Sequence, residues 1–292
     1  MNHQPEILAP VASSGRFLTL GLAPGADPRP GLSRLRDVAF DAGLVLGLGA
    51  PLVAALGRTV GRLRGAPALS GRGVAFPSTQ GAVWIFVGGE DGGEILLRAR
   101  SLALLLGDAF RVEEDVIAFR YGAGRDLTGF EDGTENPKGE RAAEVALVSG
   151  EGRGQDGGSF VAVQRWVHDT ARFERLGPAE RDLAVGRRLA TNEEIADAPS
   201  SAHVKRSAQE SFDPPAFMVR RSMPWGSVSE HGLYFVAYGA SLDPFERVLR
   251  RMAGHEDGVL DGLLAFTRPV TGGYYWCPPV DGSRLDLRAL GV

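Results

Sequence analysis

Apolar runs alternate with glycine- and proline-rich breaks along this chain, and this pattern divides it into short strands and helices. Runs of apolar, aromatic and β-branched residues predict strands over residues 17–22, 83–87, 116–121, 160–167, 233–238 and 274–276. Helix formers or apolar residues at helical spacing predict helices over residues 32–39, 94–106, 169–176, 179–188 and 243–252. The run 160–167 has only two polar positions, so we expect this strand to be covered on both faces.

The helix at residues 243–252 has the clearest start signal. Asp243 can cap it, Pro244 suits its first position, and Glu246 stands at the capping-box position. Four apolar residues then follow at positions i, i+3, i+4 and i+7, namely Phe245, Val248, Leu249 and Met252. This spacing predicts a single buried face.

Strands and helices occur in both halves of the chain, without the strict alternation that a parallel sheet requires. We therefore predict the α+β class, with two domains that each have helices packed on an antiparallel sheet. The boundary is expected in the polar stretch 134–141 or in the loop 150–158, and we place the domains at residues 1–135 and 136–292. Residue-level similarity between the halves is too weak to indicate a repeat.

Composition narrows the class of protein. The chain has 292 residues, 43% hydrophobic and 23% charged, which is ordinary for a globular protein. The net charge of −4 argues against a non-specific nucleic-acid binder. The single cysteine, Cys277, excludes an intramolecular disulfide and a multi-cysteine metal site. No apolar run reaches the ~18 residues of a membrane span, and the N-terminus lacks a signal-peptide pattern, so we predict a cytoplasmic location.

Several common catalytic motifs are missing from the sequence. The five histidines form no HExxH motif, and neither a phosphate-binding loop nor a GxSxG elbow is present. Gly152, Gly154 and Gly157 fit GxGxxG, but a strand-like run follows them where dinucleotide binding needs a helix.

Three segments could carry chemistry. Residues 129–137 place acids beside an aromatic residue and between glycines, which is either an ordinary turn or a loop that approaches a ligand. His203 follows an acidic loop, and a lone histidine is more often structural than a ligand. Strand alternation would turn Arg220 and Ser222 to one side and Arg221 to the other. An inward arginine needs an anionic partner, whereas paired arginines are more often solvated.

Taken in order, these segments resemble the dye-decolorising peroxidase family. Residues 129–133 match the family signature GxxDG, residues 201–204 resemble the segment with the proximal haem ligand, and residues 220–226 resemble the distal arginine strand. Further similar segments are 134–137, 158–169, 186–187, 192–195, 231–235 and 266–275. The resemblance covers roughly residues 122–279 and is closest to the B-type branch, which includes the porphyrinogen peroxidases. It implies two ferredoxin-like domains, with haem b held mainly by the C-terminal one.

The resemblance also implies roles for single residues. His203 would ligate the haem iron, and Asp261 would accept a hydrogen bond from His203 and raise its basicity. Asp132 would move a proton between the two oxygens of hydrogen peroxide, and Arg220 would stabilise developing negative charge. Ser222 stands where many B-type members have asparagine, and it would hydrogen-bond on the distal side.

Other positions are implied less directly. Arg187 and Arg206 are candidate partners for the haem propionates. Four aromatic residues could relay electrons from bulky donors or could simply pack in the core: Trp166, Tyr274, Tyr275 and Trp276.

The family resemblance therefore implies a haem b peroxidase that reduces hydrogen peroxide and oxidises organic donors such as dyes, phenols or porphyrinogens. Its partners would be peroxide, small organic donors and further copies of itself, without nucleic acid or membrane. Two alternatives stay open. One is a haem- or porphyrin-handling protein with little peroxidase turnover, and the other is a haem-free α+β interaction module.

Overall fold

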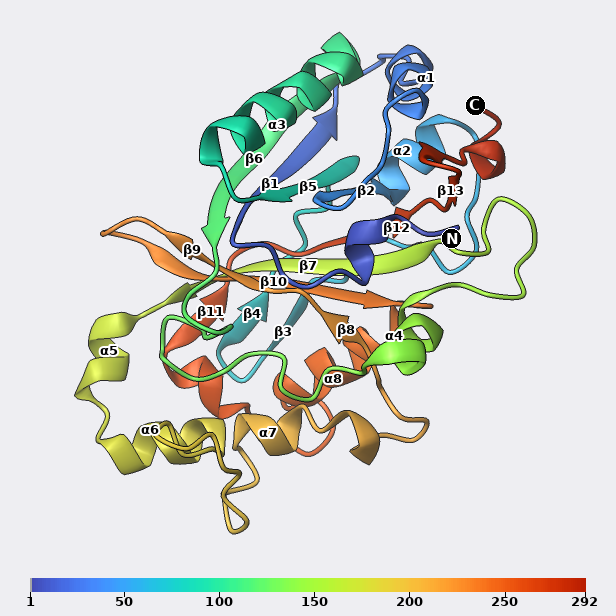
Figure 1. The fold of residues 1–292 in the computed structure, drawn as a ribbon. Helices are drawn as coiled ribbons and strands as arrows, with labels where there is room; N and C mark the ends of the chain where they lie inside the picture. The colour runs from blue at the N-terminus through green and yellow to red at the C-terminus, as the bar shows by residue number, and fades with distance from the viewer. Residues whose placement is uncertain (1) are drawn as a thin grey trace.

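The main sheet of this protein closes on itself (Figure 1). The computed structural model describes residues 2–292. In spatial order its strands are β11 (Thr267–Pro269), β7 (Ser159–His168), β12 (Gly273–Cys277), β2 (Leu44–Gly49), β5 (Val83–Gly89), β1 (Ser14–Leu22), β6 (Phe110–Phe119), β9 (Met223–Gly226), β10 (His231–Gly239) and β8 (Val219–Arg220). Because β7 also pairs with β10, the strands from β7 round to β10 form a ring, and every neighbouring pair in it is antiparallel.

The ring consists of two groups of four strands, and both have the order fourth, first, third, second along the chain when the second group is taken in the reverse direction. The first group is β6-β1-β5-β2 and the second is β9-β10-β7-β12. In each group the first strand along the chain lies between the fourth and the third. The groups join where β12 pairs with β2 and β6 pairs with β9. The predicted α+β class with antiparallel sheets is confirmed, and the boundary at residues 135/136 stays a prediction.

Helices cover the outside of the ring (Figure 1). On the N-terminal group lie α1 (Arg29–Arg36) and α3 (Gly92–Leu106), and α2 (Ala50–Ala55) follows β2. The C-terminal half contains α4 (Gly139–Ala146), α5 (Thr170–Arg175), α6 (Pro178–Val185), α7 (His203–Arg206) and α8 (Asp243–Met252). Two small hairpins complete the fold, β3 (Leu69–Gly71) with β4 (Val74–Phe76) and β13 (Val280–Asp281) with β14 (Arg284–Leu285). No helix within residues 2–292 is long and apolar enough to cross a membrane.

Strand alternation divides the buried side chains into separate layers. In β1, Phe17 packs inside the ring, whereas Leu18 packs with the apolar residues under the helices. Phe17 stacks on Tyr234 of β10 with ring centroids 4.0 Å apart. In β10 the next residue, Phe235, therefore faces outward from the ring, on the side where the C-terminal helices lie. The ring interior joins the two halves, and its outer face is free to build a site.

The predicted elements are confirmed, with changes at their ends. The strand predicted at 116–121 begins at Phe110 in the structure. Its first half was not predicted, because that half is charged and exposed and shows no apolar alternation. The helix predicted at 179–188 ends at Val185, because Gly186 adopts a left-handed conformation with φ of 89°. As expected, β7 is buried from Ser159 to Gln164. The strand that the resemblance implies at residues 220–226 is present as β8 and β9, whereas β2, β3, β4, β11, β13 and β14 were not predicted.

The capping prediction for α8 is wrong in detail. The cap position belongs to Leu242, and Asp243 is already inside the helix. Both predicted capping acids bind Arg64 instead. The Asp243 carboxylate lies 2.6 Å from Nη2 of Arg64, and the Glu246 carboxylate lies 2.8 Å from its Nε. This ion pair fastens the loop before β3 to the start of α8.

Candidate active site

A cavity lies between the outer face of the C-terminal strands and the helices that cover it. Its empty volume is about 1020 Å³, counting the open space at its mouth. The apolar face predicted for α8 lines it with Phe245, Val248, Leu249 and Met252. From the sheet come Trp166, Leu233 and Phe235. The α8 stripe thus provides an apolar wall for a bulky ligand.

The helix side of the cavity presents His203, the first residue of α7. Its Nδ1 lies 2.8 Å from Oδ2 of Asp261, whose side chain is fully buried. The other carboxylate oxygen of Asp261 accepts the backbone N–H of Leu263 at 2.9 Å. With Nδ1 donating to a carboxylate, Nε2 keeps the lone pair that a metal ligand needs. The predicted His203–Asp261 pair is therefore present at the cavity wall.

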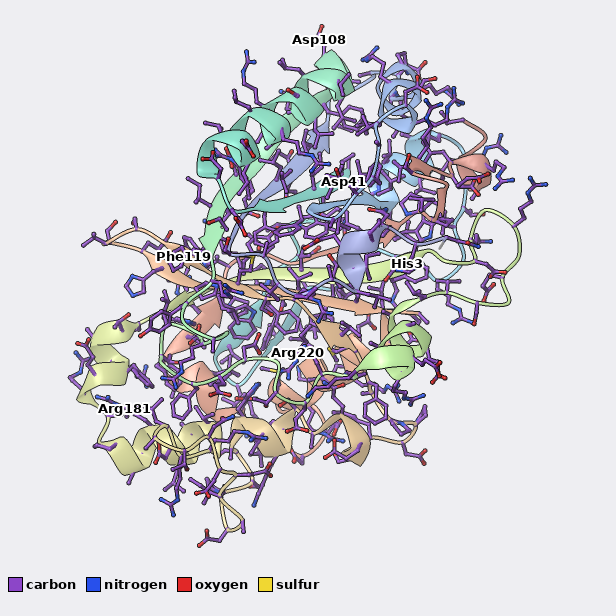
Figure 2. The ribbon with its side chains drawn as sticks, viewed as in Figure 1. His3, Asp41, Asp108, Phe119, Arg181 and Arg220 are labelled. Carbon is purple, nitrogen blue, oxygen red and sulfur yellow. The ribbon has the colours of Figure 1, made fainter. Side chains whose placement is uncertain are left out.

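The sheet side presents Asp132 and Arg220 (Figure 2 labels Arg220). The loop of Asp132 turns at Gly129 and Gly133, with φ of 91° and 72°, which glycine adopts readily. Asn136 then binds the backbone of Arg220 twice, through Oδ1 at 2.8 Å and Nδ2 at 2.9 Å. The loop and strand β8 are thus held together.

The charged ends of these two side chains are close. Nη1 of Arg220 lies 3.6 Å from Oδ1 of Asp132. Nε of Arg220 is buried and has no hydrogen-bond partner within residues 2–292. A buried donor without a partner is costly, so this arginine is suited to bind an oxygen atom of a ligand.

Ser222 lies in a smaller neighbouring cavity of about 430 Å³, which shares Asp132 and Arg220 with the large one. Arg221 turns the other way, and its Nε donates to the Ala9 carbonyl at 2.8 Å. The predicted alternation along 220–222 is therefore confirmed. Ser222 itself does not line the large cavity, and its hydroxyl lies 3.4 Å from the Val236 backbone N–H.

The two candidate propionate partners do not line either cavity. Arg187 binds Glu135 at 3.0 Å and Glu194 at 3.3 Å. Arg206 forms a bidentate pair with Asp257 at 2.6 and 2.9 Å. Both guanidinium groups thus already have carboxylate partners in the protein.

Because of the Arg206–Asp257 pair, we expect the free energy of unfolding to fall in acid. Hydrogen bonding to Arg206 lowers the pKa of Asp257 to about 2, so the folded state favours the carboxylate. The stabilisation is complete above pH ~4, the unfolded value, and is lost as the pH falls toward 2. Because the Asp257 side chain is 48% exposed, we expect no more than about 1 kcal/mol. Urea unfolding across this range should show a shallower pH dependence for Asp257→Asn than for the parent, with Asp27→Asn, at an exposed ion pair, as the control.

One group of residues that lines the cavity was not predicted from the sequence. His168, at the end of β7, lies 2.9 Å from Oδ1 of Asp126 and 2.7 Å from Oγ1 of Thr267. Burial raises the pKa of Asp126, but hydrogen bonds from His168 and Thr128 outweigh it and leave the pKa below its usual value. The two residues are 42 positions apart, and no motif links them in the sequence.

The four aromatic residues considered as electron relays are all buried: Trp166, Tyr274, Tyr275 and Trp276. Trp166 lines the cavity, and the other three lie on β12. Their burial fits core packing, and a relay role stays a prediction.

Comparison with known proteins gives a consistent result. The family described as "Dyp-type peroxidase, C-terminal" matches residues 123–282. The dye-decolorizing peroxidase of Mycobacterium tuberculosis is 34% identical over 211 residues, which cover 70% of this chain and 63% of that protein. The dye-decolorizing peroxidase of Mycolicibacterium paratuberculosis is 30% identical over 302 residues, covering 95% of this chain and 84% of that protein.

Solved structures show the same similarity. A variant of DypB from Rhodococcus jostii RHA1, in complex with heme, superposes with a TM-score of 0.87 at 29% identity. The match covers 94% of this chain and 95% of that one, so the whole fold is shared, including the part before residue 123.

Proposed function

Because the chain belongs to the family of Dyp-type, dye-decolorising peroxidases, we propose that it is a haem b peroxidase that reduces hydrogen peroxide and oxidises small organic donors one electron at a time. One observation carries the proposal. A single cavity brings His203, backed by Asp261, together with Asp132 and Arg220, although these residues come from separate parts of the chain.

The residues present fit a haem group. The cavity is large and mainly apolar, as a porphyrin requires, and Nε2 of His203 is available as an iron ligand. On the sheet side, the buried Nε of Arg220 lacks a partner in the protein. Bound haem would supply the electron transfer from donors to peroxide.

The protein's own residues would manage the protons and the charge. The Asp132 carboxylate can take a proton from one oxygen of hydrogen peroxide and return it to the other. Arg220 donates to the oxygen on which negative charge develops. Asp261 holds His203 in one orientation and raises its basicity as a ligand. Ser222, in the smaller cavity, would orient a water or peroxide near Asp132.

The finer predictions belong to the same proposal. Each strand group has the order expected of a ferredoxin-like domain, with the first strand between the fourth and the third. Of the residues assigned to the haem site, all except Asp132 lie in the predicted C-terminal domain, which supports a haem held mainly by that domain. Membership of the B-type branch, haem contacts of Arg187 and Arg206, a cytoplasmic location and self-association stay predictions.

The absorption spectrum, before and after one equivalent of hydrogen peroxide, tests this function. We expect a Soret band that shifts within seconds of peroxide addition. A Soret band that does not respond would instead indicate a haem- or porphyrin-handling protein. No Soret band after haem is added would contradict the proposal and favour a haem-free α+β module.

A further inference from the structure

Three side chains on the cavity wall form a hydrogen-bonded triad that has no role in the proposed reaction. His168 lies between Asp126 and Thr267, at 2.9 and 2.7 Å. Asp126 precedes the loop of Asp132, His168 ends β7, and Thr267 begins β11. The triad thus connects a loop to two strands of the sheet.

The neighbouring hydrogen bonds indicate where the protons of this triad lie. The Thr267 hydroxyl has one hydrogen and lies 3.0 Å from the Val167 carbonyl, so when it donates there it accepts from Nδ1 of His168. Asp126 is held as a carboxylate, because its Oδ2 already accepts both the N–H and the hydroxyl of Thr128, at 3.0 and 2.5 Å. In this pattern both ring nitrogens of His168 donate, one to the Asp126 carboxylate and one to the Thr267 hydroxyl.

The resulting ion pair is shielded from water. The side chain of His168 is 7% exposed and that of Asp126 is 14% exposed. At such sites charges interact more strongly than at a surface, and removing one partner leaves the other charge buried and unpaired. The contact between the loop and the sheet is therefore tight.

The loop held in this way leads directly to Asp132. The Asp126 N–H donates to the Phe130 carbonyl at 2.8 Å, and the Gly129 N–H donates to the Asp126 carbonyl at 2.8 Å, which closes a compact turn. The Asp132 N–H then donates to the Gly124 carbonyl at 3.0 Å. A shift of Asp126 would move this turn and with it the Asp132 carboxylate.

We propose that His168 is a positioning residue, which as an imidazolium between Asp126 and Thr267 fixes the loop and so sets the position of the Asp132 carboxylate in the cavity. His168 makes no hydrogen bond to Asp132 and acts only through the backbone of the loop. The inference rests on the proposed function, because it assumes that Asp132 acts on peroxide.

A double-mutant experiment on the haem-loaded protein tests the proposal. His168→Gln should lower the second-order rate constant for hydrogen peroxide about 10- to 100-fold, since small displacements of a catalytic group have effects of this size. The Soret band should change little, whereas the melting temperature should fall, because the buried Asp126 carboxylate loses its partner. In an Asp132→Ala background, His168→Gln should have no further effect on the rate. His231→Gln is the matched control, because His231 also binds a threonine hydroxyl, that of Thr170, but does not line the cavity.

The possible results separate the two claims. Equal slowing in both backgrounds, or no slowing in either, would overturn the positioning role. An Asp132→Ala protein with the parent rate would instead contradict the proposed function.

The protonation state can be read without activity. Nitrogen-15 spectra of the diamagnetic ferrous carbon monoxide complex should show both His168 nitrogens protonated at neutral pH, with His168→Gln identifying the signals. Asp126→Asn, whose amide can donate to a neutral ring, should remove one of these protons. This second variant tests the ion pair even if His168→Gln does not fold. A neutral ring in the parent protein would overturn the proposal.

Discussion

Replacing His203 by alanine should abolish stable haem binding, with an affinity loss of more than about 100-fold, beyond the range seen for residues that only support a metal ligand. His203 offers the cavity an imidazole whose Nε2 has a free lone pair, because Asp261 occupies Nδ1. The other cavity histidine, His168, cannot substitute, because both of its nitrogens are engaged.

Titration of haem-free protein with haemin, followed at the Soret band, measures this loss. His255→Ala is the control, since His255 is exposed and its Nε2 lies 3.3 Å from the Ser70 carbonyl, away from the cavity. Added imidazole should restore binding to His203→Ala by entering the space that the side chain leaves. Unchanged haem affinity in His203→Ala would remove His203 from the site.

Replacing Arg220 by alanine should leave haem bound but slow the reaction with hydrogen peroxide by about 10²- to 10³-fold, the usual effect of losing one donor to a developing negative charge. The guanidinium lies 3.6 Å from Asp132, and its buried Nε has no protein partner in the described chain. We therefore expect the loss of this Nε donor to affect the reaction with a ligand more than folding. Stopped-flow absorption of the Soret band gives the rate constant.

The neighbouring arginine provides a matched control. Arg221 binds the carbonyls of Leu8 and Ala9 and lines neither cavity that contains Asp132. We expect Arg221→Ala to keep the peroxide rate and to lower the melting temperature. Arg220→Lys, which keeps the charge but not the forked geometry, should recover only part of the rate. An Arg220→Ala protein that reacts at the parent rate would contradict the assigned role.

The fold class and most of the longer elements could be predicted from the sequence, because both depend on local patterns. The closed ring could not, since it depends on pairing between β12 and β2 and between β6 and β9. These strands come from opposite halves of the chain, and their sequences contain no signal for their partners. The apolar stripe of α8 was predicted correctly as a face, but the pattern could not show that the face borders a cavity.

In the candidate site too, contacts between residues far apart in the sequence could not be predicted from local patterns. His203 and Asp261 are 58 residues apart, and only the family resemblance connected them before the structure did. Arg206 was predicted as a propionate partner from its charge and position. The structure pairs it with Asp257, which is 51 residues away. His168 lies in one of the segments similar to the family, residues 158–169, but nothing in the sequence links it to Asp126, so the pair became visible only through its hydrogen bonds.

The closed ring also limits how copies of the protein could associate. An open sheet has long edge strands whose free N–H and C=O groups can pair with another chain. Here the main sheet ends in β11 and β8, which are 3 and 2 residues long. Extension from these two terminal strands by a neighbouring molecule therefore has almost no template. An assembly that does not extend the sheet would be specified by side chains on the outer surface, which evolution can change without disturbing the ring that supports the cavity.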